Sequence, residues 1–368
     1  MNQMNTSPTR SGASKKQAAS VEFRNVTKRY GGVTAVDSVS FTIEPGKLVT
    51  LLGPSGCGKT TTLRMIAGLE MASEGQILIG GRDVTNLSAA DRDVSMVFQS
   101  YALFPHMSVL ENVAYGPSVQ GASRKDAEAM AMEKLGLVGL KGLERRAPSE
   151  LSGGQQQRVA VARALVLEPQ VLLFDEPLSN LDAKLRRRVR EDIRELQQSL
   201  NLTVAYVTHD QEEALAVSDR IIVMSNARIA QSGTPRELYE EPADLFVADF
   251  IGDANILGGT ITGIEGASAQ VKIDTLSLSL PHRGAAPGAV KLAVRPDAIL
   301  LNETPQPSAI AGHIRKASYL GTQIEYDVET AIGNLFVVQY GRTQPIEIGK
   351  AVGVTFETQR GVAIVPGA

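Results

Sequence analysis

The segment GPSGCGKT, residues Gly53 to Thr60, constrains this chain more than any other. It matches the pattern G-x-x-x-x-G-K-[ST] in full, follows the apolar run KLVTLL and opens a helical pattern. The glycines let backbone N–H groups curl around phosphate oxygens, and the helix N-terminus adds a partial positive charge. We expect Lys59 to reach the β- and γ-phosphates of a nucleotide and the Thr60 hydroxyl to ligate Mg²⁺. The nucleotide-binding residues predicted here are Gly53, Pro54, Ser55, Gly56, Cys57, Gly58, Lys59, Thr60 and Thr61.

Two adjacent acids end an apolar run further along the chain. The segment VLLFDE, residues 171–176, predicts a buried strand that brings Asp175 and Glu176 to the carboxyl edge of a sheet, where ligands of such folds bind. We expect Asp175 to hold Mg²⁺, directly or through water, and Glu176 to orient and deprotonate an attacking water. Two acids at a strand end are equally typical of a solvated terminus. The segment therefore predicts catalysis only together with the phosphate-binding loop.

Strand-like and helix-like patterns alternate from Val21 to about residue 235. Short apolar runs typical of buried strands occupy residues 47–53, 171–176, 203–209 and 220–224. Between two of these runs, apolar residues recur every three or four positions, which predicts an amphipathic helix (Leu181, Leu185, Val189, Ile193, Leu196 and Leu200). Strands alternating with helices imply a mainly parallel sheet covered by helices.

The pattern changes after about Asp253, where short β-like runs separated by Gly and Pro replace the helical periodicity. In IEYDV, residues 324–328, Ile, Tyr and Val face one way and Glu and Asp the other, so we expect a small all-β barrel or sandwich. The predicted organisation is a disordered tail over 1–20, a nucleotide-binding domain over 21–235, a linker over 236–255 and a β-rich domain over 256–368.

A second glycine-rich segment is LSGGQ, residues 151–155, followed by QQRVAVARAL. Its serine and glycines predict an exposed loop at the start of a helix, which is another anion-binding end. The chain then has two phosphate-binding loops but one Lys59 and one carboxylate pair. Through these motifs the sequence resembles the ATP-binding-cassette (ABC) family. The resemblance implies that two copies pack head to tail, each completing the ATP site of the other with Ser152, Gly153, Gly154 and Gln155.

Four further positions match the pattern of that family. Tyr30, in KRYGG, resembles the aromatic residue that stacks on adenine. Gln99, in MVFQSYALFPH, resembles the glutamine that touches Mg²⁺ and the attacking water, and residues 101–109 would then face a membrane permease. His209, in YVTHD, resembles the histidine that contacts the γ-phosphate, and Asp182, in SNLDAKLR, corresponds to an interface residue. The resemblance implies Mg²⁺ and ATP as ligands, with Thr60, Gln99 and Asp175 on the metal and Glu176, His209 and Gln99 in catalysis.

The resemblance covers about residues 21–232 and continues in GTPRELYEEPADLF, KLAVRPDAI and SYLGTQIEYDV, which look like the TOBE-type region of importer ATPases. It implies an α/β P-loop NTPase fold with a mainly parallel sheet, antiparallel β and helical subdomains, and then a small OB-like all-β domain. It also implies permease partners, a periplasmic or extracellular substrate-binding protein, and a peripheral place on the cytoplasmic face of the bacterial inner membrane. The expected cargo is iron(III), with polyamines (spermidine or putrescine) and 2-aminoethylphosphonate as alternatives.

Several observations bear on other functions. The net charge of −3 gives no electrostatic reason to expect a nucleic-acid partner. No apolar run approaches the roughly 20 residues that span a bilayer, and the N-terminus lacks the apolar stretch of a secretory signal. A soluble ABC ATPase acting on DNA or the ribosome is disfavoured by the single phosphate-binding motif and the lack of a large insertion between Gln99 and Leu151. Cys57 lies in the loop, so we expect a thiol reagent to block ATP binding.

Overall fold

The computed structural model describes residues 18–304, 306 and 308–366. The disordered tail predicted over residues 1–20 lies outside the described residues as far as residue 17. Beyond that point Ala19 is buried, and its N–H donates to the Gln170 carbonyl oxygen at 3.4 Å. The chain forms two compact units built from separate stretches: the chain through Lys28 with 40–48 and 60–206, and residues 29–39 and 49–59 with the chain from Val207 onward.

The first unit contains antiparallel and parallel strands. Three strands pair antiparallel: β1 (Val21–Tyr30), β4 (Glu74–Ile79) and β5 (Arg82–Asp83). Three others are β6 (Val94–Val97), β7 (Val171–Asp175) and β8 (Thr203–Val207). β6 and β7 pair in parallel, and every residue of β7 and β8 is buried. Strands buried along their whole length match the apolar runs from which β7 and β8 were predicted.

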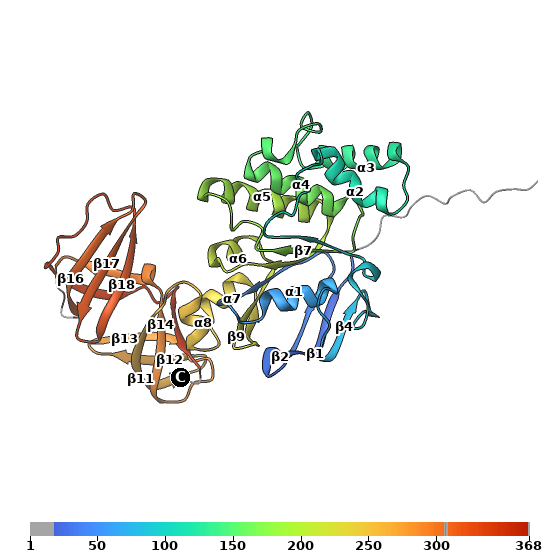
Figure 1. The fold of residues 1–368 in the computed structure, drawn as a ribbon. Helices are drawn as coiled ribbons and strands as arrows, with labels where there is room; N and C mark the ends of the chain where they lie inside the picture. The colour runs from blue at the N-terminus through green and yellow to red at the C-terminus, as the bar shows by residue number, and fades with distance from the viewer. Residues whose placement is uncertain (1–17, 305, 307, 367–368) are drawn as a thin grey trace, which may run out of the picture. The chain divides into compact units, whose positions relative to one another are not determined.

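Four helices of the first unit, α2, α3, α4 and α5, lie together in one layer, and α1 lies outside that layer (Figure 1). The helices are α1 (Lys59–Ala67), α2 (Val109–Val119), α3 (Arg124–Leu137), α4 (Gly153–Leu165) and α5 (Ala183–Leu200). α5 is the predicted amphipathic helix, and it buries Val189 and Ile193. Its N-cap is Asp182, whose side chain accepts a hydrogen bond from the Leu185 N–H. An apolar cluster built on Val113, Leu135 and Val159 joins α2, α3 and α4.

The second unit begins with strands and short helices: β3 (Leu48–Leu52), β9 (Arg220–Ser225), β10 (Arg228–Gly233), α6 (Gln211–Val217), α7 (Pro235–Glu240) and α8 (Leu245–Phe250). β3 pairs with β9 in parallel, and β9 pairs with β10 antiparallel. Hydrogen bonds order these three strands as β10-β9-β3, and β2 (Val33–Ile43) has residues in both units. The fold is thus the predicted α/β class with an added antiparallel sheet.

The C-terminal part of the second unit is all-β, as predicted. One five-stranded sheet has the order β13-β12-β11-β14-β20 and another has the order β15-β19-β16-β17-β18. The strands are β11 (Asn255–Glu265), β12 (Ser268–Ile273), β13 (Leu276–Pro281), β14 (Gly288–Val294), β15 (Ile299–Asn302), β16 (Ile310–Tyr319), β17 (Gln323–Thr330), β18 (Gly333–Tyr340), β19 (Ala351–Phe356) and β20 (Val362–Val365). One core contains residues of both sheets, and the alternating residues Ile324, Tyr326 and Val328 of β17 all lie in it.

A buried arginine ties the β-rich part to the two short helices that precede it. Arg295 is 1% exposed and donates to the carbonyl oxygens of Tyr239, Ala248 and Ile251 at the C-terminal ends of α7 and α8. Its guanidinium also stacks on the Tyr239 ring, 4.3 Å from the centroid. A cation is favourable at a helix C-terminus because the last carbonyl groups have no partner within the helix.

Among the described residues, no helix combines the length and the apolarity that crossing a membrane requires.

Candidate nucleotide site

The phosphate-binding loop connects β3 to α1, and its backbone requires glycine. Gly53, Gly56 and Gly58 have φ values of 156°, 79° and 105°. A Cβ atom would lie 2.2 Å from the Met224 carbonyl oxygen if added at Gly53, and 2.4 Å from the Ala35 carbonyl oxygen if added at Gly58. At Gly56 a Cβ would meet nothing within 4 Å. Two of the glycines therefore allow close packing of the loop, and the third leaves its outer side open.

Lys59, the first residue of α1, places its ammonium group over this loop. The side chain is 6% exposed, and Nζ donates to the carbonyl oxygens of Gly53 at 2.7 Å and Pro54 at 2.9 Å. Cys57 Sγ is the third neighbour, at 3.9 Å from Nζ. A cation faced by uncharged groups is incompletely compensated, so the loop is complementary to an anion. This arrangement fits the phosphate groups of a nucleotide.

Cys57 is buried, contrary to the expectation that a thiol reagent would reach it. The side chain is 5% exposed, and a Cβ at Gly53 would lie only 2.7 Å from its Sγ atom. Burial raises the pKa of the thiol, an effect that the nearby Lys59 charge only partly offsets. The thiol is a packed part of the loop, and its protonated form is favoured.

The residues predicted to bind Mg²⁺ include a hydroxyl and a carboxylate that lie together. Thr60 Oγ1 donates to Asp175 Oδ1 at 3.5 Å, which joins the first turn of α1 to the end of β7. Asp175 is 8% exposed. In the described part of the chain, no three His, Cys, Asp or Glu side chains gather as a metal cluster. A hydroxyl and one carboxylate suit Mg²⁺, which usually binds proteins through one or two side chains and completes its shell with phosphate and water.

Gln99 and Glu176 are connected through a serine. Glu176 follows β7 with a left-handed φ of 45°, an uncommon conformation for a residue with a side chain. Gln99 Nε2 donates to Ser179 Oγ at 3.2 Å, and that hydroxyl donates to the Glu176 carbonyl oxygen at 3.0 Å. Asn180 Nδ2 donates to the Gln99 carbonyl oxygen at 3.0 Å. The sequence analysis did not identify Ser179 and Asn180, although both lie in the segment SNLDAKLR that contains Asp182.

Ser152 is the N-cap of α4, as expected for the LSGGQ segment. Its hydroxyl accepts from the Gln155 N–H at 3.4 Å, and its own N–H donates to Gln155 Oε1 at 3.0 Å, which is a capping box. Ser152 is exposed, whereas Gly154 is buried, so the expected exposed glycine loop is only partly exposed. A Cβ at Gly154 would lie 2.8 Å from Leu185 Cδ1. This glycine therefore allows α4 and α5 to approach closely, a role that the sequence did not indicate.

Arg163, in the last turn of α4, holds the segment that follows Gln99. Tyr101 and Ala102 are consecutive left-handed residues with φ of 61° and 49°. Arg163 donates to their carbonyl oxygens at 2.8 and 2.6 Å, and its guanidinium lies 5.7 Å from the centroid of the Phe104 ring. Tyr101 is buried rather than exposed, so its side chain does not belong to the surface predicted to face a permease. The arginine was missed because its run, QQRVAVARAL, looks like an ordinary helix.

The remaining predicted residues lie at the ends of elements. Tyr30 ends β1 and is 45% exposed, and Asp182 is the exposed N-cap of α5. His209 is exposed in the turn between β8 and α6. Positions of this kind suit contacts with a ligand or a second chain, and the specific roles of these three residues stay predictions.

Comparison with known proteins defines the class. A family model described as "ABC transporter" matches residues 36–179, and one described as "TOBE domain" matches residues 292–364. Relatives named as Fe(3+) ions import ATP-binding proteins match nearly the whole chain at more than half identity. The chain belongs to the ABC transporter family and is an ATP-hydrolysing transport subunit, as the resemblance implied.

The names of these relatives specify the ion that they import. The chain is 59% identical over 348 residues to the Fe(3+) ions import ATP-binding protein FbpC 1 of Rhizobium meliloti (strain 1021), covering 95% of this chain and 98% of the relative. The identity is 58% to FbpC of Brucella abortus (strain 2308), with 94% and 98% covered, and 52% to FbpC of Escherichia coli O157:H7, with 84% and 87% covered.

Solved structures resemble the nucleotide-binding part of the chain. A dimeric bacterial ABC transporter cassette, MJ0796, has a TM-score of 0.53 and 32% identity, covering 59% of this chain and 99% of the cassette. CbiO1 of Clostridium perfringens, described as part of the ABC transporter complex cbiONQ, has a TM-score of 0.56 and 27% identity over 60% of this chain and 90% of its own.

Proposed function

We propose that this chain is the ATPase of a binding-protein-dependent importer of iron(III). The observation that supports this cargo is the 52–59% identity, over 84–95% of the chain, to relatives whose names all specify Fe(3+) import. The nucleotide-binding residues hydrolyse the ATP that drives transport, and they do not contact the cargo. Polyamine and 2-aminoethylphosphonate import are the alternatives, and the cargo experiment below separates them from iron(III).

The chain's own residues take the following parts in hydrolysis. Lys59 and the loop Gly53–Thr61 bind the phosphates, and Tyr30 stacks on adenine. Thr60, Asp175 and Gln99 hold Mg²⁺, which when bound offsets phosphate charge in the transition state. Glu176 accepts the proton of the attacking water, and His209 contacts the γ-phosphate. Gln99 is hydrogen-bonded to Ser179, and Ser179 to the backbone carbonyl oxygen of Glu176. These bonds hold the glutamine and the base in fixed positions relative to each other.

Two copies form the working ATPase. Ser152, Gly153, Gly154 and Gln155 of each copy complete the site of the other, and Asp182 lies at their interface. The similarity to a cassette described as dimeric supports this arrangement. We further propose that residues 21–235 form the nucleotide-binding domain, 236–255 a linker and 256–368 the TOBE-type domain. The dimer docks on permease subunits at the cytoplasmic face of the inner membrane, and a periplasmic or extracellular binding protein supplies the cargo.

The test is a pull-down of the tagged Glu176→Gln variant from detergent-solubilised membranes of its own organism, in the presence of ATP. We expect a multi-span permease together with a binding protein, and we expect that binding protein to bind iron(III) in preference to spermidine, putrescine or 2-aminoethylphosphonate. Preference for one of the other compounds would overturn the cargo. Recovery of ribosomes or DNA-repair proteins without a permease would overturn the importer assignment.

A further inference from the structure

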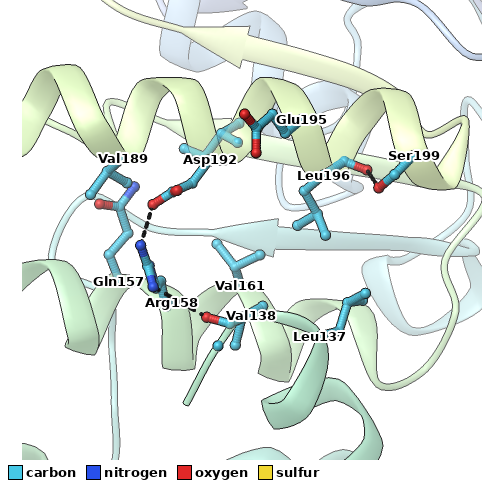
Figure 2. Close-up of a pocket in the computed structure, with 12 residues that line it drawn as sticks. Leu137, Val138, Gln157, Arg158, Val161, Val189, Asp192, Glu195, Leu196 and Ser199 are labelled. Carbon is cyan, nitrogen blue, oxygen red and sulfur yellow. Dashed lines mark hydrogen bonds and ion pairs between the residues drawn. The ribbon is translucent and has the colours of Figure 1, made fainter.

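A cavity of about 370 Å³ lies between α4 and α5, where the end of α3 meets them (Figure 2). Half of its twelve lining residues are aliphatic: Leu137, Val138, Val161, Val189, Ile193 and Leu196. Ligand sites in proteins are typically cavities of this size, predominantly apolar, with a few polar groups that fix orientation. The cavity lies apart from Lys59, Asp175 and the other predicted nucleotide-binding residues, none of which lines it.

Gln157 of α4 is the polar group that sets this cavity apart. Its side chain is 0% exposed, and neither Nε2 nor Oε1 has a hydrogen-bond partner. Figure 2 shows its amide in the space between α4 and α5, beside Val189. A buried amide without partners is unfavourable by an amount comparable to a lost hydrogen bond at each atom. The unused groups are the two N–H donors of Nε2 and the acceptor oxygen Oε1 of the same planar amide.

The rim of the cavity disfavours an anion. Arg158, the cation of the rim, is paired with Asp192 at 2.5 Å and also donates to the Val138 carbonyl oxygen at 3.5 Å (Figure 2). Glu195 adds a second carboxylate to the lining. The charges near the opening therefore sum to one negative charge. An uncharged ligand that offers both a donor and an acceptor to Gln157 matches these groups best.

The position of the cavity connects it to the predicted trans site. Ser152 is the N-cap of α4 and Asp182 is the N-cap of α5, and both residues are expected at the dimer interface. At that end the helices touch closely, because a Cβ at Gly153 would lie 3.0 Å from Leu181 Cδ2 and one at Gly154 2.8 Å from Leu185 Cδ1. The cavity separates the same helices further along. A molecule that moves α4 and α5 apart on filling it would therefore shift Ser152 relative to Asp182.

We propose that this cavity binds a small uncharged molecule with an apolar body and a primary carboxamide, or an equivalent donor–acceptor group, and that binding lowers the ATPase rate. The amide of Gln157 has no exposed surface, so its side chain must turn toward the cavity to pair with the carboxamide. The body of the ligand contacts Val161, Ile193 and Leu196. The effect on the rate, but not the binding itself, rests on the proposed roles of Ser152 and Asp182.

The probe is benzamide, compared with acetophenone, which has the same shape and carbonyl group but no N–H donor. Affinities for the full chain are measured by ligand-observed NMR titration, and ATPase rates by phosphate release. We expect benzamide to bind roughly tenfold more tightly than acetophenone, because acetophenone cannot make the hydrogen bond from a carboxamide N–H to Gln157 Oε1 and leaves that oxygen without a partner. Leu196→Trp fills the cavity and should abolish binding, whereas Gln198→Trp, an exposed position on the same helix, should not. Gln157→Leu should make the two affinities equal.

Absence of benzamide binding, or binding that survives Leu196→Trp unchanged, would overturn the site. Binding with no change in the ATPase rate would overturn its regulatory part. The basal ATPase rate without benzamide is a separate readout: a chain that binds benzamide as described but hydrolyses no ATP contradicts the proposed function and leaves the cavity assignment standing.

Discussion

Glu176 is the residue whose chemistry is tested most directly. Replacement by Gln keeps the shape of the side chain and its contacts but removes the proton acceptor, so we expect ATP hydrolysis to fall by about 10²–10⁴-fold. ATP binding should be retained, because the phosphate-binding loop and Lys59 are unchanged. Phosphate release and nucleotide binding are measured on the same samples. Glu133→Gln, an exposed acid of α3, is the matched control, and equal turnover in Glu176→Gln and wild type would contradict the assigned base.

Two buried glutamines on neighbouring helices should respond oppositely to the same change. Gln157 makes no hydrogen bond through its side chain, whereas Gln197 of α5 donates to the carbonyl oxygens of Gly46 at 2.8 Å and Leu202 at 2.9 Å. Replacing a partnerless buried amide by Leu removes a desolvation penalty, so Gln157→Leu should stabilise by about 1 kcal/mol. Gln197→Leu leaves those carbonyl groups unpaired and should cost about 2 kcal/mol. Thermal midpoints measure both; a shift of the same sign would show that Gln157 is satisfied, for example by water.

Cys57 supplies a prediction about pH. Because burial raises the pKa of its thiol, the reactive thiolate is scarce at neutral pH and increases as the pH rises. Alkylation of the native protein by N-ethylmaleimide should therefore be slow at pH 7, and its rate should still be rising above about pH 8.5, the ordinary pKa of cysteine. Rates are followed by mass spectrometry, with the urea-unfolded chain as the fast reference. Equal rates in the two states would mean that the thiol is exposed.

At the scale of elements, Arg163 connects α4 to the segment after Gln99. Arg163→Ala would leave the carbonyl groups of Tyr101 and Ala102 without their charged donor, at a cost of about 2 kcal/mol. We expect faster amide hydrogen exchange over residues 99–106 and a smaller stimulation of ATPase by the permease, with less effect on the basal rate. Arg163→Lys keeps the charge but not the planar fork, so it should rescue only partly. Unchanged exchange over this segment would show that Arg163 does not hold it.

The same elements show where sequence reasoning succeeds and where it stops. The β7 strand, the α5 helix and the alternation in β17 were predictable because burial imposes a period on the sequence. The side-chain contacts that connect these elements were not predictable. Ser179 and Arg163 act on backbone carbonyl groups, which leave no trace in the sequence, and Gly154 is needed because of Leu185 on another helix. The burial of Cys57 likewise depends on how the loop packs, so the motif that located the loop gave the wrong expectation for its thiol.

At the scale of the whole molecule, the head-to-tail dimer makes a quantitative prediction. Lys59→Ala removes the phosphate-binding lysine from one copy, and Ser152→Arg blocks the segment that the copy offers to its partner. Each variant alone should be inactive, because every site contains one defect. A mixed dimer, by contrast, has one site with both defects and one with none. Random pairing makes half of the dimers mixed, so if the sites act independently an equimolar mixture should recover about a quarter of the wild-type rate.

The control for this experiment is a mixture of Lys59→Ala with Glu176→Gln, which lie on the same side of the site. Every site in that mixture contains a defect in its own copy, so no recovery is expected. Recovery in both mixtures would indicate that the variants are not fully inactive. Recovery in neither would mean that one intact site cannot turn over while the other is blocked, and would exclude independent sites. Recovery only with Ser152→Arg would establish that Lys59 of one copy and Ser152 of the other act on the same ATP. The two motifs imply this arrangement, but within a single chain they do not form one site.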